Sequence, residues 1–356
     1  MNARKKSALS GKVQTVLGPV EPSTLGPTLM HEHLLISLEA YYVQPDEASE
    51  RAYIDKPVSM EMLGGLRRRW YYNMDEMRLW DERAAIEEVL QFKYAGGGSV
   101  VDTTSIGIAR DPLALARISR ATGLNVIMGG GWYVPLSHPP DMDTRSEDSL
   151  TEEIIRDVIV GVKDTGVKTG VIGELGNFHP LTANEKKVLR AAARAQVETG
   201  APITTHTGQG NQSSIDILNE LVKAGADPKH VMMGHLGPNM RDRKALLELA
   251  QSGCYLQYDH FGAFEDTTSR YLQYSDTTVN DVQRMEYIEF LFEHGHGSQV
   301  LISHDVCWKS HLTRYGGKGY AHILENIVPR LHKRSLTRKD TDAILIHNPA
   351  RALAFI

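Results

Sequence analysis

The stretch Pro27–Ile36, PTLMHEHLLI, decides the fold of this chain. Its length and apolar character are typical of a buried strand, yet it contains His31 and His33 on either side of Glu32. Because side chains alternate between the two faces of a strand, the two imidazoles are expected to point the same way. The stretch therefore predicts a buried strand that presents two histidines on one face.

Seven further apolar runs follow, and segments with helical periodicity separate them. The runs span 99–106, 125–134, 168–176, 201–208, 230–237, 254–262 and 299–306. This alternation is typical of a parallel sheet with crossover helices. Eight such units in roughly 330 residues favour closure into a barrel. We therefore predict an α/β fold, a (β/α)8 TIM barrel.

An open, doubly wound sheet is the competing fold. It would normally carry a glycine-rich dinucleotide turn between a strand and a helix. No run in the sequence matches that turn, and GGGS at 96–99 precedes a strand instead. The order of the elements thus favours the closed barrel.

The intervening segments carry start and stop signals of helices. Thr182 and Glu185 predict a capping box before a helix that ends at Gly200. Ser149 and Glu152 predict the same device for the helix that precedes the fourth strand. The segments 243–253 and 281–295 also show apolar residues at helical spacing and end in glycine.

One region breaks the regular alternation. Residues 38–80, between the first two strands, form an elaborated loop that we expect to lie over one end of the barrel and to contribute an oligomer contact. The sequence contains no internal linker, so we predict a flexible N-terminal tail over 1–10 and a single barrel domain over 11–356.

Composition excludes several classes of protein. A net charge of -5 and a pI near 6.3 give no basic footprint for nucleic acid. Only Cys254 and Cys307 are present, too few for a disulfide framework or a thiolate zinc site. No run reaches the roughly 18 apolar residues of a membrane span. We expect a cytoplasmic protein that acts on a small molecule, without nucleic-acid or membrane partners.

Potential metal ligands stand late in five of the eight apolar runs. These residues are His31, His33, Glu174, His206, His235 and Asp305. In a (β/α)8 enzyme, the carboxyl ends of the strands build the active site. We therefore expect four imidazoles and two carboxylates to meet at one rim of the barrel.

Each of these residues also has a structural interpretation. A single strand-end histidine is usually a hydrogen-bonded structural residue, Glu174 could be a salt-bridged core carboxylate, and Asp305 could cap a helix. Six coincidences at one rim are much less plausible than one. Imidazole and carboxylate ligands without thiolate suit Zn, Mn, Co or Fe, and we predict two divalent metal ions, zinc being the first choice.

The motifs together resemble the phosphotriesterase family of the amidohydrolase superfamily, and most closely its phosphotriesterase-related branch. HEH on the first strand, GVIGELG, THTG, GHLG, SHD and HNPARAL (347–353) carry the resemblance, which runs from about Ser10 to Ile356. It implies that His31, His33 and Asp305 bind the more buried metal ion. It also implies that His206 and His235 bind the more exposed one. Together with the aromatic residues near Trp70 and Trp80, it suggests a homodimer.

Glu174 departs from the pattern of the well-studied members, which have a carboxylated lysine at the bridging position. The nearest lysine, Lys168, stands at the beginning of the fourth strand, about 20 Å of strand rise away. The resemblance therefore implies that Glu174 itself bridges the two metal ions, as a glutamate does in other branches of the family.

These residues predict a binuclear metal-dependent hydrolase. A metal-bridging hydroxide would attack a carboxylic ester, a lactone or an N-acyl amide, with phosphotriester cleavage as a side activity. Asp305 would be the catalytic proton acceptor, with His260 as its partner. Tyr133, His260 and Lys309 are candidate substrate contacts. A packed rim tyrosine and a loop histidine are equally reasonable interpretations of the first two, and for Lys309 taken alone surface solvation is the favoured one. The alternatives are a dedicated organophosphate triesterase and a non-catalytic small-molecule-binding barrel.

Overall fold

Eight parallel strands form the centre of the molecule, as predicted. The computed structural model describes residues 9–263 and 279–356, so residues 1–8 of the predicted tail lie outside the described residues. The barrel strands are β3 (Thr28–Glu32), β6 (Ser99–Asp102), β7 (Asn125–Gly130), β8 (Val171–Gly176), β9 (Ile203–His206), β10 (Val231–Met233), β11 (Tyr255–Tyr258) and β12 (Val300–Ile302). Their spatial order follows the chain, β3-β6-β7-β8-β9-β10-β11-β12. The (β/α)8 TIM barrel is thus confirmed.

Side-chain bonds from Glu32 help to close the barrel between β3 and the segment after β12. The two Glu32 carboxylate oxygens accept hydrogen bonds from the Ser303 hydroxyl (2.7 Å) and from the backbone N–H groups of His304 (2.9 Å) and Val306 (3.0 Å). The Asp305 N–H also donates to the His31 carbonyl oxygen at 3.2 Å. Glu32, between the two histidines of the first strand, therefore has a structural role in joining the first and last barrel segments.

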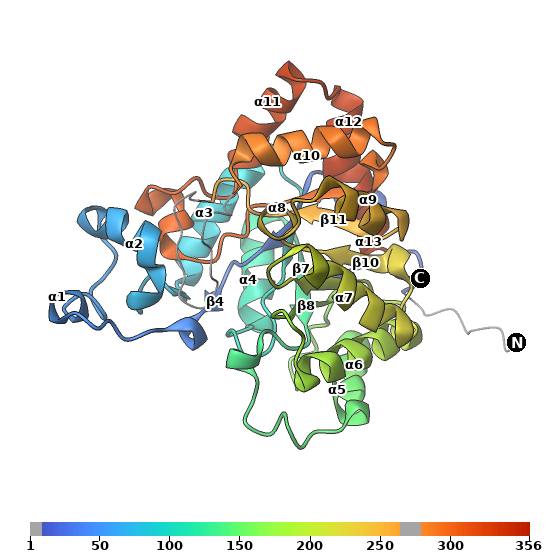
Figure 1. Cartoon of the computed structure of the whole chain (residues 1–356), viewed down its shortest axis with the longest axis horizontal. Helices are drawn as coiled ribbons and strands as arrows, with labels where there is room; N and C mark the ends of the chain where they lie inside the picture. The colour runs from blue at the N-terminus through green and yellow to red at the C-terminus, as the bar shows by residue number, and fades with distance from the viewer. Residues whose placement is uncertain (1–8, 264–278) are drawn as a thin grey trace, which may run out of the picture.

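Helices surround the strands (Figure 1). They are α3 (Glu82–Tyr94), α4 (Pro112–Thr122), α5 (Glu147–Ile159), α6 (Ala183–Thr199), α7 (Asn211–Lys223), α8 (Leu236–Asn239), α9 (Arg243–Gln251), α10 (Asp281–Glu293), α11 (Val328–Lys333), α12 (Arg338–Asp342) and α13 (Asn348–Leu353). In Figure 1, α5, α6 and α7 lie on one side of β10 and β11, and α10, α11 and α12 lie on the other. Among the described residues, no helix is both long and apolar enough to span a bilayer.

Short helical turns connect many of these elements. They are η1 (Pro22–Thr24), η5 (Pro135–Ser137), η6 (Pro228–His230), η7 (Gly297–Gln299), η8 (Lys309–His311), η9 (Thr313–Tyr315), η10 (Ile323–Ile327) and η11 (Ala343–His347). Two of them, η10 and η11, are single π-helical segments that lead directly into α11 and α13.

The helix termini test two of the predicted caps. The capping box of Thr182 and Glu185 is present, and Gly200 ends α6 in the left-handed conformation, with φ of 77°. The predicted capping box of Ser149 and Glu152 is wrong. The N-cap of α5 is Ser146, whose hydroxyl accepts a hydrogen bond from the Ser149 N–H at 3.1 Å, so the helix starts earlier than predicted.

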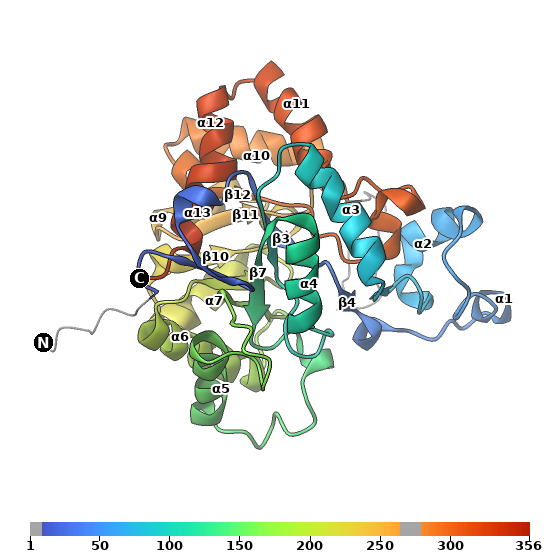
Figure 2. The same cartoon turned by 180° about the vertical axis from the view of Figure 1, so that it is seen from behind.

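The amino-terminal half of the barrel interior is apolar. One layer of fully buried side chains fills it, comprising Met30, Val101, Ile127, Val171, Met232 and Leu301. The antiparallel pair β1 (Val13–Thr15) and β2 (Gly18–Val20) covers this end, where the Val16 N–H donates to the Val126 carbonyl oxygen at 2.9 Å. Figure 2 shows the fold from behind, with α4 beside β7.

Residues 38–80 form the predicted elaborated loop, which we call the excursion. It contains η2 (Glu39–Tyr41), α1 (Ala48–Arg51), η3 (Met60–Met62), α2 (Leu63–Arg69), η4 (Trp70–Tyr72) and β5 (Arg78–Leu79), and β5 pairs with β4 (Ile36–Ser37). Its helices α1 and α2 project to one side of the barrel (Figure 1).

The excursion is fastened to the loop after β12. The rings of Trp70 and Trp308 lie 3.9 Å apart between centroids, and the Glu76 carboxylate accepts a hydrogen bond from the Ser310 N–H at 3.0 Å. This contact places the excursion beside the loop that carries Asp305, at the carboxyl ends of the strands.

Candidate active site

Glu174, near the end of β8, lies at the centre of the predicted ligand set. A carboxylate oxygen of Glu174 lies 3.3 Å from His31 Nε2, 3.2 Å from His33 Nε2, 3.2 Å from His206 Nδ1 and 3.7 Å from His235 Nε2. Four imidazoles, from the ends of β3 and β9 and from the turn after β10, thus surround one carboxylate. The positions of these residues at strand ends predicted that they meet at one rim of the barrel.

Asp305 completes the set from the segment after β12. Its Oδ1 atom lies 3.2 Å from His33 Nε2 and 3.7 Å from His31 Nε2. All six predicted ligands therefore lie together at the carboxyl ends of the strands. Lys168 precedes β8, which begins at Val171, and so lies at the opposite end of that strand from Glu174.

Ligand atoms within 4.8 Å of one another form several overlapping groups. Those built from the predicted set are His31, His33 and Glu174; Glu174, His206 and His235; and His31, His235 and Asp305. The first two groups share Glu174, as a bridging carboxylate requires. The third group contains both His31 and His235, so ligands of the two predicted metal sites lie next to each other.

Two of the six residues have an unusual backbone conformation. His235 has φ of 57° and Asp305 has φ of 56°, in the left-handed region that residues other than glycine rarely adopt. Such conformations cost of order 1–3 kcal/mol and persist where surrounding contacts enforce them. Their presence at two predicted ligands supports a functional interpretation of this rim.

The charges of the site follow from burial and mutual proximity. Burial alone would raise the pKa of Glu174, but the His31, His206 and His235 imidazoles hold that pKa well below its usual value. Burial and the neighbouring His235 lower the pKa of His206 to about 4, so this imidazole is neutral at pH 7.

The other three histidine rings behave differently. Burial lowers the pKa of His33, but the Asp305 and Glu174 carboxylates raise this pKa to about 10. Neighbouring carboxylates also raise the pKa of His31 and of His235. Binding of a divalent ion would therefore release protons from these three imidazoles.

The donor set fits a divalent metal centre. His31 Nε2 is buried and has no hydrogen-bond partner among the described residues, although it points toward the Glu174 carboxylate. A buried polar atom without a partner is costly unless a ligand satisfies it. Imidazole nitrogens and carboxylate oxygens are the donors that zinc and related ions accept.

A second layer of buried polar groups contacts the backs of the histidines, and sequence reasoning did not identify it. His33 Nδ1 lies 2.9 Å from the Thr104 hydroxyl. His235 Nδ1 lies 2.8 Å from Asp259 Oδ1, and Gln257 Nε2 lies 3.0 Å from His31 Nδ1. The signal for Gln257 and Asp259 was their polarity inside the apolar run 254–262.

Tyr133 and His260, two of the predicted substrate contacts, lie at the site. The Tyr133 hydroxyl is 3.2 Å from His206 Nδ1 and 3.4 Å from the Tyr41 hydroxyl, which the excursion supplies. Burial and the nearby Tyr41 raise the pKa of Tyr133 well above its usual value, so it stays a hydrogen-bond donor. His260 Nε2 lies 3.4 Å from Asp305 Oδ2, as expected for a proton-transfer partner.

Lys309, the third predicted substrate contact, has a different environment. Its ammonium group forms an ion pair with Asp75 of the excursion. This pair adds to the contact between the excursion and the loop after β12. A substrate-binding role for Lys309 stays a prediction.

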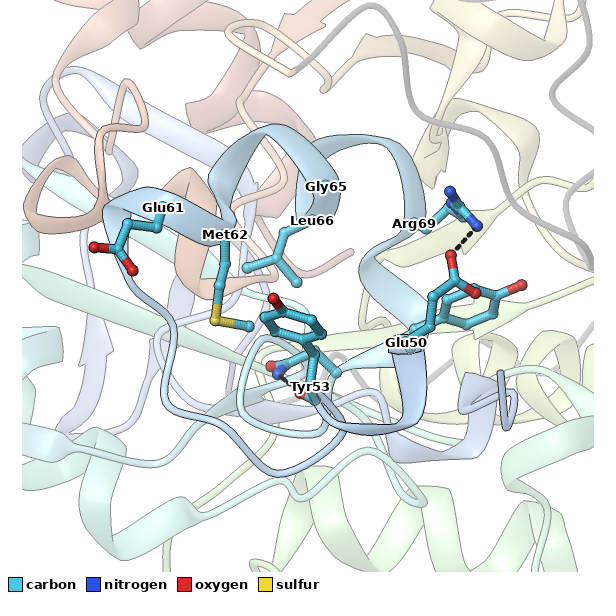
Figure 3. A pocket seen from close by; sticks show the side chains of 9 residues that line it. Glu50, Tyr53, Glu61, Met62, Gly65, Leu66 and Arg69 are labelled. Atoms are coloured by element: carbon cyan, nitrogen blue, oxygen red, sulfur yellow. Dashed lines mark hydrogen bonds and ion pairs between the residues drawn. The ribbon is translucent and has the colours of Figure 1, made fainter. Parts of the chain in front are cut away.

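A separate pocket of about 220 Å³ lies within the excursion (Figure 3). Tyr53, Met62 and Leu66 face it, and the ion pair of Glu50 and Arg69 lies at one end. None of the six predicted metal ligands lines this pocket. It is therefore distinct from the imidazole cluster.

Comparisons with known proteins agree with this geometry. The sequence model of the phosphotriesterase family matches residues 11–353. The N-acetyltaurine hydrolase of Rattus norvegicus is 41% identical over 350 residues, which cover 98% of this chain and 99% of that protein. The crystal structure of a resiniferatoxin-binding protein from Rhodobacter sphaeroides is similar, with a TM-score of 0.92, 36% identity and coverage of 99% of this chain and 98% of the other. A mutant of the PTE-like lactonase of Deinococcus radiodurans is also similar, with a TM-score of 0.75, 27% identity and coverage of 96% and 99%.

Proposed function

The chain belongs to the phosphotriesterase family, and from this premise we propose that it is a metal-dependent amidohydrolase that cleaves an N-acylated amino compound of the N-acetyltaurine type. The curated relatives at 40–41% identity are named for hydrolysis of an amide of this kind, and they cover nearly the whole chain. The observation that carries the proposal is the convergence of four histidines on Glu174, which gives this chain a full set of donors for such a reaction.

The residues that would hold the metal are the six predicted ligands. In this proposal His31, His33 and Asp305 would hold one ion, His206 and His235 would hold the other, and Glu174 would contribute a ligand to both. Divalent ions at such a site polarise the scissile carbonyl group and activate water near neutral pH.

The chain's own polar groups position the substrate. The Tyr133 hydroxyl, which lies at the edge of the imidazole cluster, donates a hydrogen bond to the oxygen of the acyl group in this proposal. Its orientation is supported by the Tyr41 hydroxyl at 3.4 Å. A donor fixed where negative charge develops on oxygen stabilises the transition state of acyl transfer.

Asp305 and His260 provide a route for the proton. Asp305 Oδ1 faces His33 while Oδ2 faces His260 Nε2. The carboxylate can therefore take up a proton at Oδ2 and pass it to His260 Nε2, 3.4 Å away. Burial and the neighbouring His235 lower the pKa of His260, so the ring is neutral at pH 7 and able to accept the proton.

Small-molecule binding without turnover is a second candidate function. The specific observation in its favour is the 36% identity to a protein described as resiniferatoxin-binding. Binding of an apolar ligand alone does not need six metal donors at one rim, however. The amidohydrolase is therefore the better-supported function.

A substrate panel on purified, zinc-loaded protein tests the proposal. The panel contains N-acetyltaurine, N-acetyl amino acids, a lactone and a phosphotriester, with wild type, Glu174→Ala and the control His294→Ala, which alters an exposed histidine at the end of α10. We expect the highest kcat/KM on an N-acetylated amine, loss of that activity in Glu174→Ala, and retention in His294→Ala.

Other outcomes of the panel would contradict the proposal in different ways. A higher kcat/KM on the phosphotriester would make organophosphate hydrolysis the main function. A higher kcat/KM on the lactone would favour ester cleavage. Tight ligand binding without turnover of any compound would favour the binding protein.

A further inference from the structure

Asp259 lies between two histidines that belong to different predicted metal sites. It follows β11, is fully buried, and was not among the predicted site residues. Its Oδ1 atom lies 2.8 Å from His235 Nδ1, and its Oδ2 atom lies 3.4 Å from His31 Nδ1. His31 is on β3 and His235 follows β10, and β11 and β12 separate these two strands in the barrel. One carboxylate thus connects two histidines from non-adjacent strands.

We propose that Asp259 is a shared positioning residue, which holds the Nδ1 atoms of His31 and His235 so that both Nε2 atoms face Glu174. The inference rests on the proposed function only in taking these histidines as metal ligands. A neutral imidazole carries one proton, and an acceptor at Nδ1 fixes the proton there and leaves the Nε2 lone pair for a metal ion. Outer partners of this kind orient metal-binding histidines.

The contact with His235 extends to its backbone. The His235 N–H points at both carboxylate oxygens of Asp259, at 3.1 Å from each. His235 has the left-handed backbone conformation, with φ of 57°. Asp259 therefore binds the main chain and the ring of the same residue, and these bonds hold the strained turn as well as the imidazole.

The contact with His31 involves Gln257. Gln257 Nε2 donates to Asp259 Oδ2 at 2.8 Å and lies 3.0 Å from His31 Nδ1. Two arrangements of the His31 proton fit these distances. Either Nδ1 carries the proton and faces Asp259, or Nδ1 accepts a hydrogen bond from Gln257. Metal binding at Nε2 of a neutral imidazole requires the first arrangement, and Asp259 supplies its acceptor.

The electrostatics of Asp259 suit this role. Among the residues that the structure describes, its ion-pair contacts are with His31, His235 and His260. The negative charge therefore acts on imidazoles at the metal site.

Zinc binding by Asp259→Asn tests the proposal without measuring turnover. Wild type and variant are loaded with zinc, and ions per chain and zinc affinity are measured by plasma mass spectrometry and by competition with a chromophoric chelator. We expect both ions to bind roughly 10–100-fold more weakly in Asp259→Asn, the usual effect of losing an outer partner. Unchanged affinity, or weakening of one ion alone, would overturn the shared role.

Glu88→Gln is the matched control. Glu88 is a buried carboxylate on α3 whose oxygens accept hydrogen bonds from the Thr313 N–H (2.9 Å) and hydroxyl (2.8 Å) and from the Arg314 N–H (3.0 Å). Glu88→Gln removes the same charge as Asp259→Asn, but Glu88 contacts no predicted metal ligand among the described residues. Zinc affinity in this variant should match that of wild type, and equal weakening in both variants would overturn the specific role of Asp259.

Imidazole NMR of zinc-loaded wild type gives a second answer that does not depend on a variant folding. Spectra of protein labelled with ¹⁵N-histidine report which ring nitrogen carries the proton. The proposal requires the proton on Nδ1 in both His31 and His235. A His31 protonated on Nε2, with Nδ1 accepting from Gln257, would overturn it.

The two proposals fail in distinguishable ways. If zinc binds as expected and weakens in Asp259→Asn, but N-acetylated amines are not cleaved, the proposed function fails and the role of Asp259 stands. If N-acetylated amines are cleaved and Asp259→Asn binds zinc like wild type, the role of Asp259 fails and the proposed function stands.

Discussion

The two ends of the barrel use the same eight strands for opposite purposes. At the amino-terminal end, Met30, Val101 and Ile127 belong to a fully buried apolar layer. At the carboxyl end, a few residues further along the same chain segments, buried imidazoles and carboxylates face one another. Apolar burial stabilises the fold, whereas buried charge costs free energy unless it is paired or binds a ligand. The comparison teaches that stability and chemistry are separated along the strands.

Glu174→Ala should give the largest effect, and it acts at the carboxyl end. Removal of the carboxylate that contacts all four histidines should lower kcat/KM by more than roughly 1,000-fold, or about 4 kcal/mol of transition-state stabilisation. Steady-state kinetics and thermal unfolding of metal-free protein measure the two quantities. If Glu174→Ala lost activity only because it unfolds, stability and chemistry would not be separated between the two ends of the barrel.

Ile127→Ala should have the next largest effect, at the opposite end. Ile127 is fully buried in the apolar layer, and its truncation should lower the free energy of unfolding by about 3 kcal/mol through lost burial and a cavity. Activity per folded molecule should stay within about twofold of wild type. Urea denaturation and active-site titration measure both, and a large loss of kcat in folded protein would contradict the comparison.

Glu76→Gln tests the cost of buried charge beside the carboxyl end. Burial raises the pKa of Glu76 in the folded protein to about 8, above its ordinary value of 4.5. Between these two pH values the unfolded chain releases a proton that the folded chain retains, so stability falls as pH rises from 4.5 to 8.

The variant lacks this titration. We therefore expect it to lose roughly 2 kcal/mol less stability than wild type between pH 5 and pH 6.5. Denaturant unfolding at a series of pH values measures the difference. Parallel pH profiles for the two proteins would show that Glu76 does not carry this cost.

Tyr133→Phe should give the smallest of these effects. The change removes one hydroxyl and keeps the ring, so we expect kcat for an N-acetylated amine to fall about tenfold, or about 1.4 kcal/mol, with zinc content unchanged. Tyr41→Phe is the matched variant, one hydroxyl further from the imidazole cluster, and should lower kcat by less than Tyr133→Phe does. A larger loss in Tyr41→Phe than in Tyr133→Phe would reverse the proposed order of the two tyrosines.

Much of the fold and of the ligand set was readable because it depends on local periodicity. The eight apolar runs correspond to the eight barrel strands, and the helix cap at Thr182 was identified from its capping box. The cap at Ser149 was misplaced because a serine three residues earlier offers the same chemistry, and the chain geometry selected Ser146. Hydroxyl caps are identified by spacing, which is ambiguous where serines repeat.

The second layer of the site was not readable in this way. Gln257 lies on β11, and Asp259 lies just after its end. Nothing in the neighbouring sequence relates either residue to His31 or His235, which they contact in the structure. Glu32 is the clearest case. It lies between two predicted ligands in sequence, yet it bonds to the segment after β12 and helps to close the barrel.

The sequence by itself determined the alternation of strands and helices and the six candidate donors, because period, spacing and residue type are properties of neighbouring residues. Tertiary structure alone decided that Glu174 lies at the centre of four imidazoles, that Asp259 contacts two of them, and that the excursion brings Tyr41 to Tyr133. These contacts join residues that are distant in the chain, and only closure of the barrel gives them definite distances.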